Sequence, residues 1–505
     1  MAGYRRRLTG VHNWAGVVFG GLLFAIFWMG TLSVFDREID RWMMPATRLA
    51  ASSDAAPGLD RIAQAVASQV PAGARQWRID LPTERTPVLR FSVQPGKGPP
   101  QVRQLDPRTL APLPEPGTLG ASGFFYPFHY GLQIAWMDLG NWLVGAAAMA
   151  MLLLLLSGVV IHRKLFAEFF TFRLHKRLPR SSLDLHGVSG VLGLPFFLVV
   201  TLSGLAIFFG MYFPTAHRGV FLEAGERGRA QFQAEAYGRY SRPAVGTPGP
   251  LSSLDAMAAR AGREWGGGVP YFVRVWWPGD AGGYVEFRRS YGNEVAMNLD
   301  QLYFDAGTGQ LLRSFQARPA MGVQRFLSGL HFIQFRHWPL RWLYFVMGLG
   351  GCVMIGAGMV FWLASRPAGK AVNDHAGRRI VQAVCVAGLA GIVLATLAYL
   401  GANRLLLAAA ALPGWSRAEL EVAVFFAAWG GSLVHAAVRG AVAWRGQLVV
   451  ICLLGWGCAF LEIATTGWHG KPAAVWGVDA VLVVVALLAA VIAGRVGRAA
   501  GRGGS

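Results

Sequence analysis

The chain has 505 residues, of which 54% are hydrophobic and only 15% are charged, and its formal net charge is +20. This composition places it among membrane proteins rather than soluble ones. The positive charge is expected to reflect membrane topology and attraction to anionic lipid, so no nucleic-acid partner is inferred. The four cysteines lie in apolar stretches without a C-x-x-C pair, which predicts neither a disulfide framework nor a cysteine metal site.

Eight apolar stretches are each long enough to cross a hydrocarbon core of about 30 Å, which takes roughly 20 helical residues. In chain order they are residues 11–35, 139–162, 187–211, 341–364, 379–400, 418–438, 447–466 and 474–494. The first run is longer than that of a signal peptide and no cleavage site follows it, so we expect it to remain as an anchor.

Lysine and arginine cluster at alternate span ends, which predicts that both the N-terminus and the C-terminus are cytoplasmic. A basic cytoplasmic loop then joins the second and third spans. The expected domains are span 1–35, outer module 36–135, span 139–162, basic loop 163–186, span 187–211, outer module 212–338, span 341–364, a four-helix membrane extension 379–494 and a cytoplasmic tail 495–505.

The two long polar segments carry the same order of elements. In the first, helical periodicity is followed by strand-like alternation, and these elements are predicted at 59–70, 75–81, 88–94 and 102–106. In the second, a helix and three strands are predicted at 254–262, 271–277, 283–289 and 301–305. Each segment is therefore predicted to be a small α+β module outside the membrane.

The spans repeat as well. His12 precedes Gly30 by 18 residues, and His186 precedes Gly204 by the same distance. Two further pairs are each 16 residues apart, Trp142 with Gly158 and Trp342 with Gly358. The motif FHYG precedes the first pair and LHFI precedes the second. Residues 1–366 thus contain span, module and span, repeated once, with an expected pseudo-two-fold axis along the membrane normal. Equivalent residues can share a ligand on that axis, which pairs His12 with His186 at the cytoplasmic level and His129 with His331 at the outer level.

Histidines inside a membrane are costly to bury, and they supply the neutral imidazole that haem iron binds. Two matched pairs on a four-helix core predict two b-type haems, held without covalent attachment because no C-x-x-C-H motif is present. The alternative is that these histidines snorkel to headgroups or lie in ordinary loops. Glycines along the first and third spans leave room for a flat macrocycle, or equally serve close helix packing: Gly16, Gly20, Gly21, Gly30, Gly190, Gly193 and Gly204.

Three other residues are candidates for contact with haem. His162 ends the second span, where its repeat equivalent is Trp362. It is expected to replace an axial ligand, to hydrogen-bond a propionate or, as the preferred interpretation, to lie among basic residues at the headgroups. Arg325 and Arg336 flank the LHF motif, and they either neutralise propionates or snorkel at the outer boundary.

The order of HNWAG, GTLSVF, FHYG, SGVVIHRKLFAEFFTFR, LDLHGVSGVLGLPFFLVVTLSG and LHF resembles the PepSY-associated transmembrane proteins, which include siderophore reductases such as the ferrioxamine reductase. The resemblance covers about 1–366. It implies a mainly α fold in a bacterial inner membrane, with periplasmic PepSY modules and a four-helix core. It also implies two b haems bound by the recurrent histidines His12, His186, His129 and His331. Phe197 stands in LPFFLVV where many relatives carry a histidine, and this departure leaves the number of haems open. The resemblance does not cover the last four spans, so their role is open as well.

The resemblance further implies reduction of a ferric siderophore or another periplasmic ferric chelate, with release of iron. No G-x-G-x-x-G motif follows a strand on the cytoplasmic side, so a nucleotide site in this chain is not expected. The electron donor is then expected to be membrane quinol or a separate reductase. The alternatives are a periplasmic peptide- or protein-binding sensor or anchor without redox activity, and a transporter.

Overall fold

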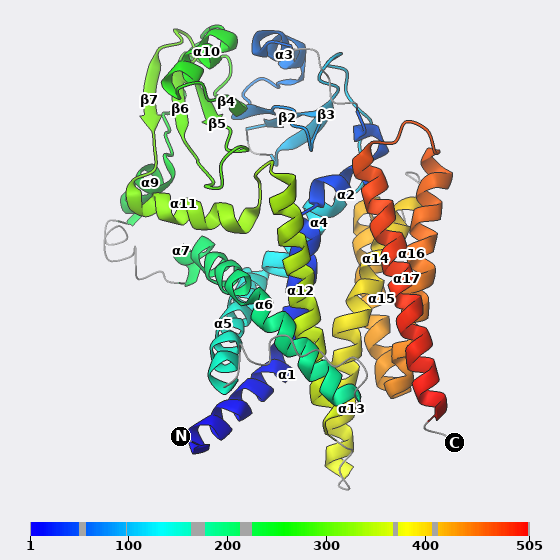
Figure 1. Cartoon of the computed structure of the whole chain (residues 1–505). Coiled ribbons are helices and arrows are strands. Elements are labelled where there is room, and N and C mark those ends of the chain that lie inside the picture. The colour runs from blue at the N-terminus through cyan, green and yellow to red at the C-terminus, as the bar shows by residue number, and fades with distance from the viewer. Residues whose placement is uncertain are drawn as a thin grey trace. The chain divides into compact units, whose positions relative to one another are not determined.

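The computed structural model describes residues 2–49, 57–96, 98–162, 177–212, 225–366, 372–406 and 413–502. Its contacts divide the chain into two units (Figure 1). The helical unit comprises Met1–Pro45, Pro116–Leu202 and Pro339–Ser505, and the sheet unit comprises Ala46–Glu115 and Ser203–Trp338.

Each long apolar sequence of the helical unit forms a helix, since in lipid a helix satisfies every backbone N–H and C=O within one segment. The helices that precede the C-terminal extension are α1 (Ala2–Ser33), α2 (Asp36–Met43), α4 (Gly120–Gly131), α5 (Leu139–Ile161), α6 (Leu178–Ile207) and α12 (Trp338–Ala364). Helix α1 packs against both α4 and α5. The last five residues of α6 belong to the sheet unit.

The C-terminal extension consists of long helices that pack side by side in Figure 1. They are α13 (Val372–Val386), a π-helical segment (Ala387–Gly391), α14 (Ile392–Leu405), α15 (Arg417–Arg439), α16 (Ala443–Thr466) and α17 (Ala473–Arg502). Hydrogen bonds attach the extension to the earlier helices: the Trp42 indole donates to Asp479 at 2.8 Å, and the Trp28 indole to Thr396 at 2.9 Å. The π-helical segment packs against α1.

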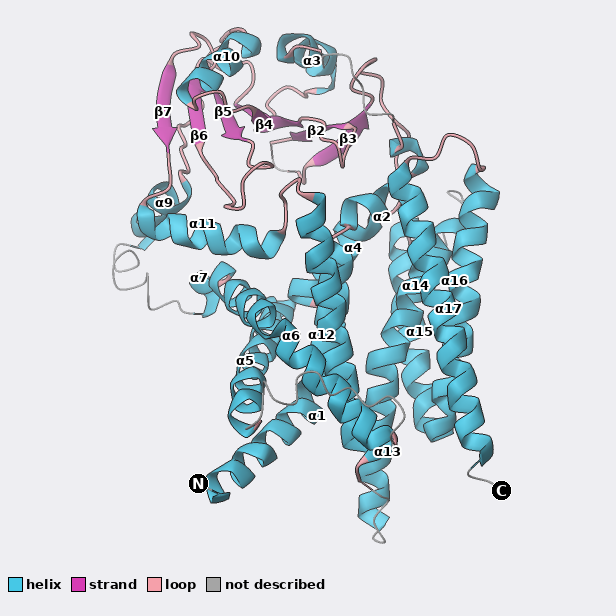
Figure 2. Ribbon diagram, viewed as in Figure 1, coloured by secondary structure: helices cyan, strands magenta, loops and turns pink. Residues whose placement is uncertain are grey.

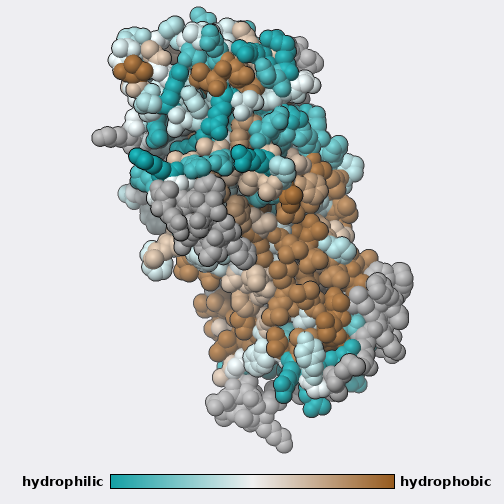
Figure 3. Space-filling view, turned by 90° about the vertical axis from the view of Figure 1, so that its left-hand side faces the viewer, coloured by the Kyte–Doolittle hydropathy of each residue, from teal (hydrophilic) through white to brown (hydrophobic). Residues whose placement is uncertain are grey.

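Seven helical stretches in the described part of the chain are long and apolar enough to cross a membrane, so the chain is a multi-pass membrane protein. The sequence predicts eight. The difference lies in Arg417–Thr466, which is one stretch of 50 residues but holds two helices joined by a 3-10 turn at Gly440–Val442. Figure 3 shows a broad apolar area on one face of the helices, and apolar side chains such as Leu156 of α5 are exposed.

The end of the predicted basic loop 163–186 differs from the structure. Helix α6 begins at Leu178, so His186 lies inside a helix rather than at the end of a loop. The polar sequence RSSLDLHG extends the helix at its N-terminal end, before the apolar stretch that hydropathy alone identifies. Residues 163–176 of the predicted loop lie outside the described residues.

One antiparallel sheet of seven strands, in the order β3-β2-β1-β4-β5-β6-β7, forms the centre of the sheet unit (Figure 2). The strands are β1 (Gln76–Asp80), β2 (Leu89–Gln94), β3 (Gln101–Leu105), β4 (Pro270–Trp276), β5 (Tyr284–Arg289), β6 (Gln301–Asp305) and β7 (Leu311–Phe315). The sequence predicts two separate modules, but β1 pairs with β4, with Arg78 opposite Arg274. Pairing covers a strand edge in each half that would otherwise expose unpaired backbone groups.

Helices α3 (Leu59–Val66) and α10 (Leu254–Glu264) cover one face of the sheet, where alternate strand residues are apolar and buried (Figure 2). The unit also contains α9 (Gly225–Tyr237), α11 (Pro319–Phe332) and the short α7 (Phe209–Tyr212). Further 3-10 turns in the chain are at Pro45–Thr47, Ala67–Gln69 and Trp136–Asp138.

The two halves of the sheet unit exchange helix caps. Asp255 accepts hydrogen bonds from the backbone N–H groups of Leu59 at 2.7 Å and Asp60 at 3.2 Å. In return, Asp60 accepts from the backbone N–H of Leu254 and from the hydroxyl of Ser253, both at 2.6 Å. Each carboxylate therefore satisfies donors at the start of the other half's helix, where intrahelical partners are lacking.

Candidate functional site

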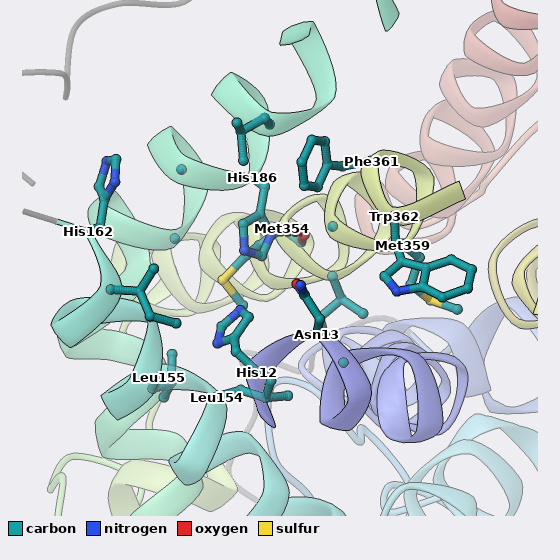
Figure 4. A pocket seen from close by; sticks show the side chains of 18 of the residues that line it. His12, Asn13, Leu154, Leu155, His162, His186, Met354, Met359, Phe361 and Trp362 are labelled. Atoms are coloured by element: carbon teal, nitrogen blue, oxygen red, sulfur yellow. Dashed lines mark hydrogen bonds between the residues drawn. The ribbon is translucent and has the colours of Figure 1, made fainter. Parts of the chain in front are cut away.

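The structure brings together the two histidines that the repeat pairs at the inner level. His12 lies on α1 and His186 on α6, and their ring centroids are 6.3 Å apart with the ring planes at 78°. Both line a cavity of about 450 Å³ that residues of α1, α5, α6 and α12 enclose (Figure 4). That volume lies within the range of small-molecule and cofactor sites.

Each of these two rings is held through its Nδ1 atom. The Nδ1–H of His186 donates to the backbone carbonyl of Met354 on α12 at 2.7 Å. The Nδ1 of His12 is 2.8 Å from the hydroxyl of Ser157 on α5, and that hydroxyl donates to the carbonyl of Leu154 at 3.2 Å. A carbonyl only accepts, so His186 carries its proton on Nδ1 and its Nε2 keeps a lone pair. His12 keeps a lone pair on Nε2 in the tautomer that donates from Nδ1 to Ser157 while Ser157 donates to Leu154.

A glycine of a neighbouring helix faces each ring. A Cβ on Gly358 would lie 2.9 Å from Nδ1 of His186, and a Cβ on Gly158 would lie 3.5 Å from Cε1 of His12. These are the two glycines that the repeated 16-residue spacing identifies. The absence of a side chain at Gly358 is what allows His186 to approach the backbone of α12, whereas a Cβ on Gly158 would make an ordinary van der Waals contact with His12.

His129 lies on α4 of the helical unit, although the sequence places it in an outer module, 36–135. Its Nδ1–H donates to the backbone carbonyl of Ile26 at 2.8 Å. A Cβ on Gly30 would lie 2.7 Å from the ring. Gly30 is the glycine that the 18-residue spacing identifies on α1.

His331 lies on α11 of the sheet unit. Its Nδ1 is 3.1 Å from the hydroxyl of Ser203, and a Cβ on Gly204 would lie 3.0 Å from its Cε1. His129 and His331 thus repeat one arrangement, with Nδ1 held and a glycine against the ring, each inside its own unit. Because the two histidines belong to different units, it is the sequence repeat that pairs them.

His162 is a third histidine on the wall of the inner cavity. It lies at the end of α5, and its repeat equivalent Trp362 lines the same cavity (Figure 4). Arg180 and Asp184, which form an ion pair at 3.1 Å, also line it. The cavity therefore combines a largely apolar wall with a small set of polar and charged groups.

The two candidate arginines differ in their surroundings. Arg325 is only 3% exposed, and its guanidinium donates to the carbonyl of Ala236 at 3.2 Å and lies 5.0 Å from the Tyr237 ring centroid. Arg336 is exposed, and its side chain packs against Gly292. Both sets of contacts lie inside the sheet unit.

Phe197, the residue for which the sequence left the haem number open, is fully buried in the middle of α6. Its ring centroid is 5.9 Å from that of Phe27 on α1. The side chain contributes packing and no ligand atom. Among the described residues, no group of three or more His, Cys, Asp or Glu side chains could hold a metal ion by itself.

The sequence identified the histidines and the glycines but missed the groups that hold the rings. Ser157 and Ser203 each precede a ring-facing glycine, and this recurring S-G dipeptide is a signal that could have identified them. The carbonyls of Ile26 and Met354 carry no such signal. Any residue supplies a carbonyl, and which one faces a ring depends on how the helices are rotated.

Two comparisons with known proteins bear on this arrangement. The family model described as PepSY-associated TM region matches residues 9–365. An uncharacterized protein of Pseudomonas aeruginosa is 30% identical over 278 residues, which cover 50% of this chain and 65% of that protein. The chain thus matches just under two thirds of that relative's length. The family match ends with α12, so α13–α17 lie outside it.

Proposed function

The chain belongs to the PepSY-associated TM region family, and from this premise we propose that it is a haem-dependent membrane oxidoreductase with two b-type haems. The region that the family model matches contains all four paired histidines. It also contains the cavity in which His12 and His186 meet.

The pairing of His12 and His186 is the observation that carries this proposal. Two imidazoles that bind one metal atom from opposite sides hold their ring centroids roughly 6 Å apart, since each metal–nitrogen bond is about 2 Å and a ring centre lies about 1 Å behind its nitrogen. The observed separation of 6.3 Å fits that arrangement. His12 and His186 would supply the two ligand atoms through Nε2, while the hydrogen bonds at Nδ1 fix the ring orientations.

The surroundings of the pair also fit a flat, largely apolar macrocycle. The cavity wall is mainly apolar, and several of its residues are glycines, including Gly16, Gly20 and Gly190. When bound, haem supplies one-electron oxidation and reduction at its iron. The protein residues fix the axial ligands, exclude water and set the polarity of the site, which together tune the potential.

His129 and His331 are proposed as the second axial pair. Each repeats, inside its own unit, the contacts of the inner histidines: Nδ1 is hydrogen-bonded and a glycine lies against the ring. Two pairs at two depths would let electrons cross a layer that ions do not cross.

Charged groups near the histidines are candidates to bind haem propionates. His162 and Arg180 line the inner cavity, where an imidazole or a guanidinium can donate to a carboxylate. At the outer level, Arg336 remains the candidate to bind a haem propionate. Arg325 already packs on Tyr237 and donates to Ala236, so we assign it to the packing of α11.

The proposed direction of electron flow is from the cytoplasmic side to the periplasm. The distribution of basic residues and the family resemblance support cytoplasmic termini in a bacterial inner membrane. Membrane quinol or a separate reductase would donate the electrons. A ferric siderophore or another ferric chelate would accept them and release its iron.

Purification of the full chain from haem-replete cells tests the proposal. We expect a red protein whose Soret band shifts on reduction, and a weaker Soret band in both His12→Ala and His331→Ala. His435→Ala is the matched control, because His435 also lies against a glycine, Gly446, but in the extension and without a repeat partner. Absorbance and a haem assay per polypeptide give the result. A colourless, fully folded protein would contradict the proposal and favour a sensor, an anchor or a transporter.

A further inference from the structure

The two halves of the inner cavity wall differ in chemistry at one position beside the histidines. Leu154 of α5 and Met354 of α12 each lie four residues before a ring-facing glycine. A Cβ on Gly16 would lie 3.9 Å from Cδ2 of Leu154, and a Cβ on Gly190 would lie 3.4 Å from Sδ of Met354. The two side chains therefore occupy equivalent places, and a thioether stands in one half where the other half has a hydrocarbon.

Met354 is close to His186 through both its backbone and its side chain. Its carbonyl accepts the Nδ1–H of His186 at 2.7 Å. Its sulfur lies against Gly190, which is one helical turn beyond His186 on the same face of α6. Both side chains line the cavity (Figure 4). The thioether and the imidazole thus share one wall, whereas His12 comes from α1.

A thioether is a ligand that haem iron binds together with histidine, and it is a soft donor suited to a reduced metal. Leu154 has no donor atom. Building on the proposed function, we propose that Met354 is a second axial donor on the His186 side of the inner cavity and can replace His186. The His12 side has no such second donor. In the exchange the iron bond to Nε2 of His186 breaks and an iron bond to Sδ of Met354 forms. Both donors are neutral, so no electron or proton moves.

If Met354 only filled space in the core, a different result would be expected. Methionine fills irregular gaps in cores, and a volume-conserving change to leucine is usually tolerated. Met359 provides the comparison within this cavity: it lines the same wall of α12, and its sulfur lies against Gly20 of α1. A substitution there changes the packing without removing the donor beside His186.

The experiment compares ligand-deletion variants of the full chain by optical and electron paramagnetic resonance spectra. His186→Ala should keep a low-spin, six-coordinate inner haem with a thioether signature. His12→Ala, its repeat counterpart, should instead give a five-coordinate, high-spin haem. Adding Met354→Leu to His186→Ala should abolish the thioether signature and the low-spin signal of the inner haem, and adding Met359→Leu should leave both in place.

Three outcomes separate this inference from the proposed function. A high-spin inner haem in His186→Ala would overturn the role of Met354 and leave the bis-histidine site standing. An inner haem that stays low-spin in His186→Ala/Met354→Leu would also overturn it, because another donor such as His162 would then be the substitute. A wild-type chain that binds no haem would refute the proposed function itself.

A second variant keeps the test open if His186→Ala does not fold. His186→Gly can be produced with imidazole in the medium, so that free imidazole fills the space and supplies the ligand. Dialysis then removes the imidazole and leaves Met354 as the donor on that wall. A six-coordinate spectrum after dialysis supports the inference, and a five-coordinate one contradicts it.

Discussion

The four imidazoles that the repeat pairs lie against glycines of neighbouring helices, and these four glycines are related by the repeat: Gly30, Gly158, Gly204 and Gly358. The repeat in the sequence singled out these histidines and glycines, but it did not predict which glycine faces which ring. It did not predict the hydrogen-bond partners, which depend on helix rotation. It also missed Met354, because a methionine in an apolar helix has the same pattern as ordinary core.

Gly358→Ala tests the contact at the scale of one methyl group. The added Cβ would lie 2.9 Å from Nδ1 of His186, so the ring must shift away from the Met354 carbonyl. We expect a loss of about 1–3 kcal/mol in stability, as overpacking usually costs, together with weaker haem retention. Gly350→Ala, on the same helix with nothing within 4 Å of its Cβ, is the matched control. Thermal unfolding and haem content measure both, and equal behaviour of the two variants would refute the contact.

At the scale of secondary structure, the sequence predicted six strands close to their observed ranges but not how they pair. Alternation identifies a strand, whereas the pairing of β1 with β4 joins segments far apart in the chain. Helix α4 was missed because GASGFFYPFHYG contains glycines and a proline, which usually end helices. Strand β7, a short edge strand at Leu311–Phe315, was missed as well.

The exchanged caps predict that the two halves of the sheet unit depend on each other. Asp255→Ala removes both acceptors at the start of α3, and Asp60→Ala removes those at the start of α10. Each should cost about 1 kcal/mol, as the loss of a helix cap does. Thermal unfolding of the full chain, followed by fluorescence, measures the loss. An effect within error for both variants would show that the caps contribute nothing.

The same caps predict an acid dependence. Burial tends to raise the pKa of Asp60, but the hydrogen bonds from Ser253, Leu254 and Asp255 outweigh it and hold the pKa below its usual value. A carboxyl with a lowered pKa stabilises the fold above its ordinary pKa, and this contribution disappears as the pH falls below about 4. Asp60→Asn should flatten the pH dependence of the melting temperature in this window. An unchanged acid limb in Asp60→Asn would argue against this role.

At the scale of the whole molecule, the extension outside the family match shares one unit with the helices that carry His12 and His186. The sequence predicted its four apolar spans but none of its contacts with the earlier helices. Those contacts rest on single residues without a repeat, such as Trp42 with Asp479. Which face of an apolar helix meets another is not encoded in hydropathy.

Gly388→Ala tests how strongly the extension is attached. A Cβ on Gly388 would lie 3.0 Å from the Cα of Gly21, and backbone cannot move aside as a flexible side chain can. We expect a lower unfolding temperature and easier proteolytic separation of the extension. Gly430→Ala, with nothing within 4 Å of its Cβ, should be neutral or stabilising, since alanine favours helix over glycine by about 1 kcal/mol. Identical protease sensitivity in both variants would mean that this contact does not hold the extension.

The exchanged caps also determine when the two halves of the sheet can pair during synthesis. Asp60 and Asp255 are 195 residues apart, and α5 and α6 lie between them in the chain. While the ribosome is still making those two helices for insertion into the bilayer, β1 has been synthesised without β4, and one of its edges is bare. Bare strand edges recruit other chains. A holdase that shields the first half-sheet until translation reaches β4 is therefore the assistance this topology calls for.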